Sequence, residues 1–210
     1  MKKLSAKQQL RLEKSGLLLA LMLPLARIIL DYFHDSLGAN PVEAMTHRTG
    51  DAALQILLLS LAVTPIHRYF RFRRAILFRR LLGLTAFFYA LIHFSIYLVF
   101  DQELSFGDTF ADVAKRPYIT MGFSSLVIML PLAITSTDKM IKRLGGPQWR
   151  RLHKAVYAAA VLAVIHYWWL VKADLTAPTL YAVCLIVLLS TRFAWWARQR
   201  NNKPVIKQPG

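Results

Sequence analysis

The chain alternates between long apolar blocks and shorter segments rich in charge. Six blocks are long enough to cross a membrane, and they cover residues 16–33, 51–67, 81–100, 118–135, 152–171 and 177–195. A helix advances about 1.5 Å per residue, so about 20 apolar residues cross about 30 Å of hydrocarbon. The pattern therefore predicts an all-α membrane protein, built as a bundle of six transmembrane helices.

Basic residues are distributed unevenly around these blocks. Five or six Lys or Arg residues lie before the first block, between the second and third, between the fourth and fifth, and from the last turn of the sixth onward. The other three connections hold one or two each. Because Lys and Arg concentrate on the cytoplasmic side, both termini are predicted to be cytoplasmic. The chain then divides into a cytoplasmic N-terminal segment (1–15), a six-helix transmembrane domain (16–195) and a cytoplasmic tail (196–210).

The net charge of +16 follows from the same distribution. In a soluble protein so basic a chain would favour a nucleic-acid partner. Here the basic residues flank apolar blocks, so we expect a lipid bilayer as partner and no nucleic acid. The single cysteine, Cys184, excludes an intrachain disulfide and any cysteine-ligated zinc or iron–sulfur site.

Three histidines fall inside predicted membrane helices: His93, His153 and His166. Polar groups in lipid are costly, which makes such residues candidates for function; the alternative is a buried histidine hydrogen-bonded to another helix. Arg80 lies near the start of the 81–100 helix, and His93 follows it by 13 residues. His166 follows His153 by the same number, and both helices are predicted to run outward. His93 and His166 should therefore share one level in the outer half, where two imidazoles can hold haem iron from both sides, as suits electron transfer.

His153 is expected about 20 Å away along the helix axis, near the cytoplasmic face. We predict that it is a ligand or contact of a second cofactor there. The matching position on the 81–100 helix is Arg80, which cannot ligate iron, whereas His67 lies at about the right depth. Arg79 and Arg80 belong to a cytoplasmic arginine cluster predicted to bind haem propionates or a flavin phosphate. The alternative is contact with anionic lipid headgroups.

The outer connection 101–117 is acidic and follows the helix that carries His93. Its carboxylates are Asp101, Glu103, Asp108 and Asp112. We predict that this segment borders the electron exit and docks a soluble periplasmic acceptor with the help of its charge. The alternative is an ordinary solvated loop.

Two other classes of function compete with electron transfer. In a transporter the histidines would relay protons, but such relays usually add membrane Asp or Glu, and transporters usually show repeated halves with broken helices. The predicted spans hold almost no acidic residue away from their ends. In an assembly or anchoring protein the histidines would be structural. No residue is predicted to be catalytic.

Several stretches resemble the MsrQ family, also called YedZ. The resemblance rests on GPQWRRLHKAVYAAAVLAVIHYWWLVK, RRLLGLTAFFYALIHFSIYL and KRPYITMGFSS, and it extends to LGANPVEAMTHRTG and TSTDKMIKRLGGPQWRRLH. The family comprises haem-containing membrane subunits of the bacterial periplasmic methionine sulfoxide reductase system. It belongs to a wider ferric-reductase-like group that typically holds two haems between four histidines on two helices, and this chain departs from that pattern at Arg80.

The resemblance implies a ferric-reductase-like, multi-pass protein of the bacterial inner (cytoplasmic) membrane with haem b and FMN as cofactors. It implies electrons from the quinone pool and delivery to MsrP, a molybdenum-containing periplasmic subunit, so that oxidised periplasmic proteins are repaired. The chain itself is then a non-catalytic redox subunit. The predicted cofactor-binding residues are His93, His153, His166, Arg79 and Arg80, with the three histidines as iron ligands. The alternative is a haem-containing, ferric-reductase-like oxidoreductase with another acceptor.

Overall fold

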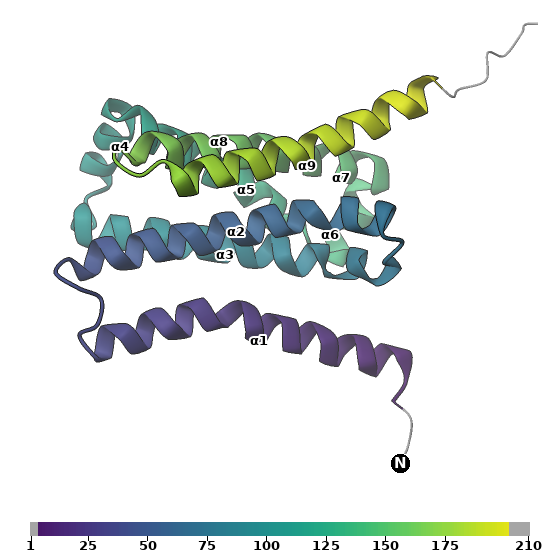
Figure 1. The fold of residues 1–210 in the computed structure, drawn as a ribbon, viewed down its shortest axis with the longest axis horizontal. Helices are drawn as coiled ribbons and strands as arrows, with labels where there is room; N and C mark the ends of the chain where they lie inside the picture. The colour runs from purple at the N-terminus through teal and green to yellow at the C-terminus, as the bar shows by residue number, and fades with distance from the viewer. Residues whose placement is uncertain (1–3, 202–210) are drawn as a thin grey trace, which may run out of the picture.

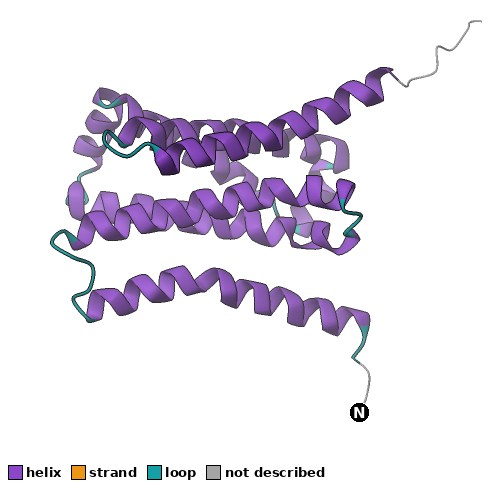
Figure 2. Cartoon of the chain, viewed as in Figure 1, coloured by secondary structure: helices purple, strands orange, loops and turns teal. Residues whose placement is uncertain are grey.

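The computed structural model describes residues 4–201, and every regular element in that range is a helix (Figure 2). The predicted all-α class is therefore confirmed. The long helices are α1 (Ala6–Phe33), α2 (Pro41–Tyr69), α3 (Arg79–Ile96), α5 (Pro117–Ile134), α8 (Val156–Leu170) and α9 (Thr176–Asn201). The shorter segments are η1 (Arg73–Phe78), η2 (Tyr97–Asp101), α4 (Phe106–Lys115), α6 (Asp138–Leu144), α7 (Gly146–Leu152) and η3 (His153–Ala155).

Five of these helical segments are long and apolar enough to cross a membrane. They are Ala6–Phe33, Pro41–Tyr69, Arg73–Asp101, Pro117–Ile134 and Thr176–Arg200, and they match five of the six predicted spans. The remaining predicted span, 152–171, corresponds to α8, which has only 15 residues. α8 is short because the chain winds as a tighter 3-10 turn at His153–Ala155, directly after α7.

Two helices start earlier than the apolar blocks that predicted them. α1 begins at Ala6, where the Ser5 hydroxyl accepts a hydrogen bond from the backbone N–H of Gln8. α2 begins at Pro41, where the Asn40 side chain caps the first turn. A side-chain acceptor at this position satisfies one of the backbone N–H groups that a helix start leaves unpaired. The polar residues that precede residue 51 are therefore helical.

Helical structure also appears in segments that were expected to be loop or tail. The acidic connection 101–117 contains α4, whose first turn is capped by Ser105. α9 runs through Asn201, so the first part of the predicted tail 196–210 is helical. Residues 202–210 of that tail lie outside the described part of the chain.

The long helices pack as two close pairs, α2 with α3 and α5 with α8. α9 packs on α2 and α8, while α1 lies along the outside of α2 and α3 (Figure 1). Small side chains such as Ala86 on α3 and Ala159 and Ala160 on α8 are fully buried at these contacts. Small residues let membrane helices approach closely, and the two pairs together enclose the site described below.

One tyrosine joins α1 to the bundle at a proline. Pro24 lies inside α1 and lacks the N–H that a regular helix uses. The hydroxyl of Tyr89, which is fully buried, donates to the carbonyl of Leu21 at 2.7 Å and accepts from the N–H of Leu25 at 3.1 Å. In a regular helix these two backbone groups bond each other. The hydroxyl is thus inserted into α1 beside Pro24 and attaches that helix to α3.

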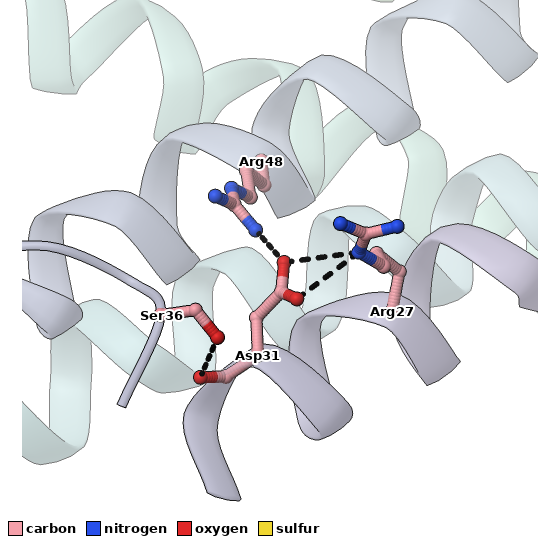
Figure 3. A network of polar contacts seen from close by, with 4 residues as sticks. All are labelled: Arg27, Asp31, Ser36 and Arg48. Carbon is pink, nitrogen blue, oxygen red and sulfur yellow. Dashed lines mark hydrogen bonds and ion pairs between the residues drawn. The ribbon is translucent and has the colours of Figure 1, made fainter. Parts of the chain in front are cut away.

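A second attachment of α1 lies at its other end (Figure 3). The Asp31 carboxylate accepts hydrogen bonds from Arg27 on its own helix at 3.0 Å and from Arg48 on α2 at 2.5 Å. The Ser36 hydroxyl donates to the backbone carbonyl of Asp31 at 3.3 Å. This network fixes the turn between α1 and α2.

Candidate functional site

A cavity of about 560 Å³ lies between the two helix pairs. Its walls are formed by α2, α3, α5 and α8, and they include apolar side chains such as Leu57, Met129 and Ala163. His93 from α3 and His166 from α8 enter it from opposite pairs. A cavity of this size with apolar walls and a few convergent polar groups is typical of a cofactor site.

The two histidines face each other inside this cavity. Their ring centroids are 6.1 Å apart, and the ring planes are inclined by 76°. The structure thus brings together the two residues that the sequence placed at one level. Within the described residues, no group of three or more His, Cys, Asp or Glu side chains is arranged to hold a metal ion. The pair could therefore offer two nitrogen atoms to a metal, with no third side chain of these types beside them among the described residues.

Each ring is oriented by a backbone carbonyl of the neighbouring helix. Nδ1 of His93 lies 2.8 Å from the carbonyl oxygen of Thr46 on α2, and Nδ1 of His166 lies 2.6 Å from that of Tyr118 on α5. A carbonyl oxygen can only accept, so Nδ1 carries the proton in both rings. Nε2 is then the unprotonated nitrogen, the one able to bind a metal. Metal-ligating histidines almost always donate their other ring N–H in this way.

A glycine lies under each imidazole, one helical turn beyond the carbonyl. A Cβ atom at Gly50 would be 3.1 Å from Nδ1 of His93, and one at Gly122 would be 2.8 Å from Nδ1 of His166. Real Cβ atoms essentially never come within 3.0 Å of another heavy atom. A side chain at Gly122 would therefore displace the His166 ring, whereas one at Gly50 would press on the His93 ring and require a shift of a few tenths of an ångström. Neither glycine was predicted from the sequence to belong to the site.

The only local signal for these glycines is their spacing. Each glycine follows by four positions the residue whose carbonyl accepts the hydrogen bond of the histidine: Gly50 follows Thr46, and Gly122 follows Tyr118. One helical turn separates them, so the carbonyl and the bare backbone lie on the same helix face. The signal gains meaning only when the opposing histidine is known, because four-residue spacings are common in any helix.

One end of the cavity is bordered by a polar cluster at α4 and η2. The Asp112 carboxylate accepts hydrogen bonds from the Tyr97 hydroxyl at 2.7 Å and pairs with Nε of Arg116 at 2.6 Å. Arg116 also donates to the Tyr118 hydroxyl at 3.2 Å, and this contact raises the pKa of Arg116. Arg116 thus stays charged where it lines the cavity, and a guanidinium there can bind an anionic group.

His153 lies apart from this cavity, at the 3-10 turn before α8. Its ring stacks on Trp149 with the centroids 3.8 Å apart. Nδ1 lies 3.1 Å from the carbonyl oxygen of Trp149, and Nε2 lies 3.3 Å from the hydroxyl of Ser136. Both ring nitrogens are thus engaged by polar atoms of the protein.

The other residues predicted for the cytoplasmic side are only partly brought together. Arg79 is close enough to His153 to interact electrostatically with it. Arg80 instead pairs with Asp138 at 2.5 Å. His67 lies at the end of α2, with Nδ1 3.4 Å from the carbonyl oxygen of Phe72. Among the described residues no hydrogen bond joins Arg79 to His153, and Arg80 has a carboxylate partner.

Comparison with known proteins agrees with this architecture. Residues 49–164 match the family described as "Ferric reductase like transmembrane component". A protein of Herminiimonas arsenicoxydans, named protein-methionine-sulfoxide reductase heme-binding subunit MsrQ, is 46% identical over 92% of this chain and 91% of its own length. Proteins with the same name from Ralstonia nicotianae and Rhodospirillum rubrum are each 42% identical, over 90% and 91% of this chain and 88% and 92% of their own lengths.

The chain belongs to the MsrQ family. The region shared with the ferric-reductase-like component contains Gly50, His93 and Gly122, and it ends just before His166. The MsrQ relatives cover the whole four-helix frame of the cavity, because their similarity extends over about nine-tenths of the chain. The MsrQ resemblance seen in the sequence is therefore confirmed.

Proposed function

We propose that the protein is a membrane electron-transfer subunit that passes electrons from the quinone pool through haem b to a periplasmic methionine sulfoxide reductase subunit. The observation that carries this proposal is the His93–His166 pair in its cavity. The printed names of the relatives describe heme-binding subunits of protein-methionine-sulfoxide reductase. Family membership and the geometry of the pair support the same role.

The donor set fits a haem held from both faces. A metal–imidazole bond is about 2 Å and the ring centroid lies about 1 Å beyond the nitrogen, so two axial imidazoles have centroids about 6 Å apart. The centroids of His93 and His166 are 6.1 Å apart. Thr46 and Tyr118 leave Nε2 as the free nitrogen of each ring. A haem between these nitrogens would supply a one-electron iron couple without an open position for substrate.

The remaining parts of the chain position this pair and surround it. Gly50 and Gly122 let each ring lie flat against a helix, while the two carbonyls prevent the rings from rotating. Apolar side chains such as Leu57, Met129 and Ala163 form part of the wall around the two rings. Arg116 at the cavity edge is proposed to hold a haem propionate, since a guanidinium binds carboxylates through paired hydrogen bonds.

We also propose six transmembrane spans with both termini cytoplasmic, in the bacterial inner membrane. The alternation of Lys- and Arg-rich connections supports this topology. The sixth span is supported by the unbroken helical run 146–170, in which α7, η3 and α8 follow one another. Twenty-five residues at about 1.5 Å each give about 37 Å, enough to cross the hydrocarbon layer. His93 and His166 then lie in the outer half of the bilayer.

The cytoplasmic side is proposed to receive the electrons. His153 and Arg79 are proposed to contact a second cofactor, a haem b or FMN, and Arg80 is proposed to assist while paired with Asp138. Family resemblance is the support for FMN and for quinol as the donor. On the outer side the acceptor is proposed to be MsrP, the molybdenum-containing periplasmic subunit. The second candidate, a ferric-reductase-like protein with another acceptor, is supported by the family match of residues 49–164.

The test begins with the protein purified from haem-replete cells. We expect a Soret band, and sharp α and β bands after reduction by a quinol. A colourless protein would contradict haem binding. The two candidate functions are then separated in liposomes that contain quinol: delivery to MsrP supports the first, whereas reduction of external ferric iron without delivery to MsrP supports the second.

A further inference from the structure

Arg192 of α9 reaches into the bundle between α2 and α8. It donates to the backbone carbonyl of Leu61 at 2.6 Å and to the hydroxyl of Tyr157, and its guanidinium lies 4.9 Å from the centroid of the Tyr157 ring. The Leu61 carbonyl would normally bond the N–H four residues later, but that residue is Pro65. Arg192 therefore satisfies a carbonyl that a proline has left without its helical partner.

The charge of Arg192 has no counter-ion in the described part of the chain. Its two hydrogen-bond acceptors are neutral oxygens, and none of the five ion pairs among residues 4–201 includes it. Arg192 is partly buried; among the described residues its Nε atom has no hydrogen-bond partner, and neither has the buried hydroxyl oxygen of Thr64, about one turn beyond Leu61 on α2. A partly buried cation with an unused buried donor is costly unless an anion accompanies it.

Two further arginines add to the positive charge that lacks a counter-ion. Arg68 and Arg79 are both close enough to repel Arg192 electrostatically. Arg68 is held in place by its stack on Trp195, with the guanidinium carbon 3.6 Å from the ring centroid. Neither Arg68 nor Arg79 takes part in an ion pair with a described residue. The stack on Trp195, three residues beyond Arg192 on α9, thus places Arg68 at the same end of the bundle as Arg192, and Arg79 at the start of α3 adds to the positive charge there.

Two neighbouring arginines do have carboxylate partners. Arg74 pairs with Glu13 of α1 at 3.0 Å, and Arg80 pairs with Asp138 of α6 at 2.5 Å. Among the described residues, Arg68 and Arg79 take part in no such ion pair. Together with Arg192 they favour an external anion with more than one negative charge or more than one acceptor oxygen.

We propose that Arg192, Arg68 and Arg79 bind a phosphate group at the cytoplasmic end of the bundle. A phosphate offers several strong acceptor oxygens, and a phosphomonoester carries about −1.5 to −2 charges at pH 7. Guanidinium groups bind such oxygens in pairs. The phosphate can belong to an anionic lipid headgroup or to bound FMN, and only the second source rests on the function proposed above.

The test compares Arg192→Gln with wild type and with Arg198→Gln, an exposed position on the same helix. Glutamine can still donate to an acceptor but carries no charge. In nanodiscs of neutral phosphatidylcholine, FMN and phosphate-free riboflavin are titrated by flavin fluorescence. In parallel, native mass spectrometry records whether protein extracted from membranes retains phosphatidylglycerol or cardiolipin. Haem spectra are recorded from every sample, so that a failure of the haem proposal is seen separately.

FMN binding at least about tenfold tighter than riboflavin binding, lost in Arg192→Gln and kept in Arg198→Gln, assigns the phosphate to the cofactor. Anionic lipid retained by wild type and Arg198→Gln but not by Arg192→Gln assigns it to a headgroup. Equal results for wild type and Arg192→Gln in both assays overturn the proposal. Loss of haem without a change in either phosphate assay assigns the site to a propionate and also overturns it.

A second variant covers the case in which Arg192→Gln does not fold. Arg68 is exposed, and its guanidinium stacks on Trp195 without a hydrogen bond or ion pair to any described residue. Arg68→Gln is therefore expected to fold normally. The proposal expects Arg68→Gln to weaken FMN binding or to reduce anionic-lipid retention, with riboflavin binding unchanged. If neither changes in folded Arg68→Gln, no phosphate is bound by this trio.

Discussion

The backbone of α5 at Gly122 is the surface on which the imidazole of His166 rests: a Cβ atom at this glycine would lie 2.8 Å from Nδ1 of the ring. The same ring nitrogen is hydrogen-bonded to the Tyr118 carbonyl at 2.6 Å, one turn earlier on the same helix. Contact with the glycine and the hydrogen bond therefore fix both the position and the rotation of His166. The corresponding contact of Gly50 with His93 is slightly looser, at 3.1 Å.

Gly122→Ala is expected to displace the His166 ring and to lower the amount of low-spin haem. The added methyl group forces an overpacking that costs about 1–3 kcal/mol, or moves the ring away from the Tyr118 carbonyl. Gly50→Ala should have a smaller effect because its Cβ has slightly more room. Low-spin haem per protein, measured by absorption, is the readout.

Gly16→Ala on α1 is the control for these two substitutions, because no atom lies within 4 Å of a Cβ placed there. It should leave the haem spectrum unchanged. If Gly122→Ala binds haem as wild type does, the close contact does not determine the position of His166.

Tyr89→Phe is expected to lower stability without removing the outer haem. The phenol hydroxyl bonds both the Leu21 carbonyl and the Leu25 N–H beside Pro24, so its loss removes the hydrogen-bond partner of two backbone groups of α1. Loss of a buried hydrogen-bond partner typically costs about 1–3 kcal/mol. Thermal unfolding in detergent measures the change, with Tyr32→Phe as the control because Tyr32 is exposed. Equal unfolding temperatures for the two variants would show that the inserted hydroxyl does not stabilise α1.

The acidic segment can now be divided by structural role. The Asp112 carboxylate is already bound by Tyr97 and Arg116, so its charge is paired within the protein. Asp101, Glu103 and Asp108 are exposed. Neutralising these three should slow electron delivery to MsrP, more at low salt than at high salt, because exposed charges steer association and are screened by ions. Reduction of the haem by quinol should remain at the wild-type rate.

The reconstituted delivery rate, measured over a range of salt concentrations, checks this docking prediction. Delivery that does not respond to the three substitutions or to salt would exclude α4 and η2 as a charge-guided docking surface. An equal loss in haem reduction would instead show that the substitutions disturb the fold.

His153→Ala is expected to slow reduction by quinol while dithionite still reduces the outer haem. The ring lies on the side proposed to receive electrons, and it contacts Trp149 and Ser136 rather than the His93–His166 cavity. The readout is the rate of haem reduction by quinol in liposomes, compared with the extent of reduction by dithionite. Wild-type rates with quinol would assign His153 a purely structural role.

The level of His93 and His166 was accessible from the sequence, but their surroundings were not. Counting residues from the basic ends of two helices places both histidines at one depth. The rotation of each helix cannot be obtained in this way, because α8 is apolar on every side and gives no preferred face. The carbonyls of Thr46 and Tyr118 and the two glycines therefore became visible only when the helices were packed together.

Segments near the membrane surface were predicted less well, for a related reason. Apolar blocks indicate where lipid contacts the chain, but helices continue into polar sequence when a cap is available, as at Asn40 and Ser5. α4 was missed because its ten residues are too few to form an apolar block of membrane length and its apolar residues are mixed with acidic ones. From the sequence, Arg192 was interpreted only as one of the basic residues that indicate the cytoplasmic side. Its partner, the Leu61 carbonyl, is available because Pro65 has no N–H to bond it.

The central claim is that His93 and His166 together hold one haem. The most direct test is the absorption and electron paramagnetic resonance spectrum of His93→Ala and of His166→Ala, with His34→Ala, an exposed histidine at the end of α1, as the control. One imidazole cannot keep iron six-coordinate. We therefore predict that each variant loses the low-spin signal of the outer haem or becomes high-spin, that added imidazole restores it, and that His34→Ala is unchanged. Full low-spin haem in both His93→Ala and His166→Ala, without added imidazole, would contradict the claim.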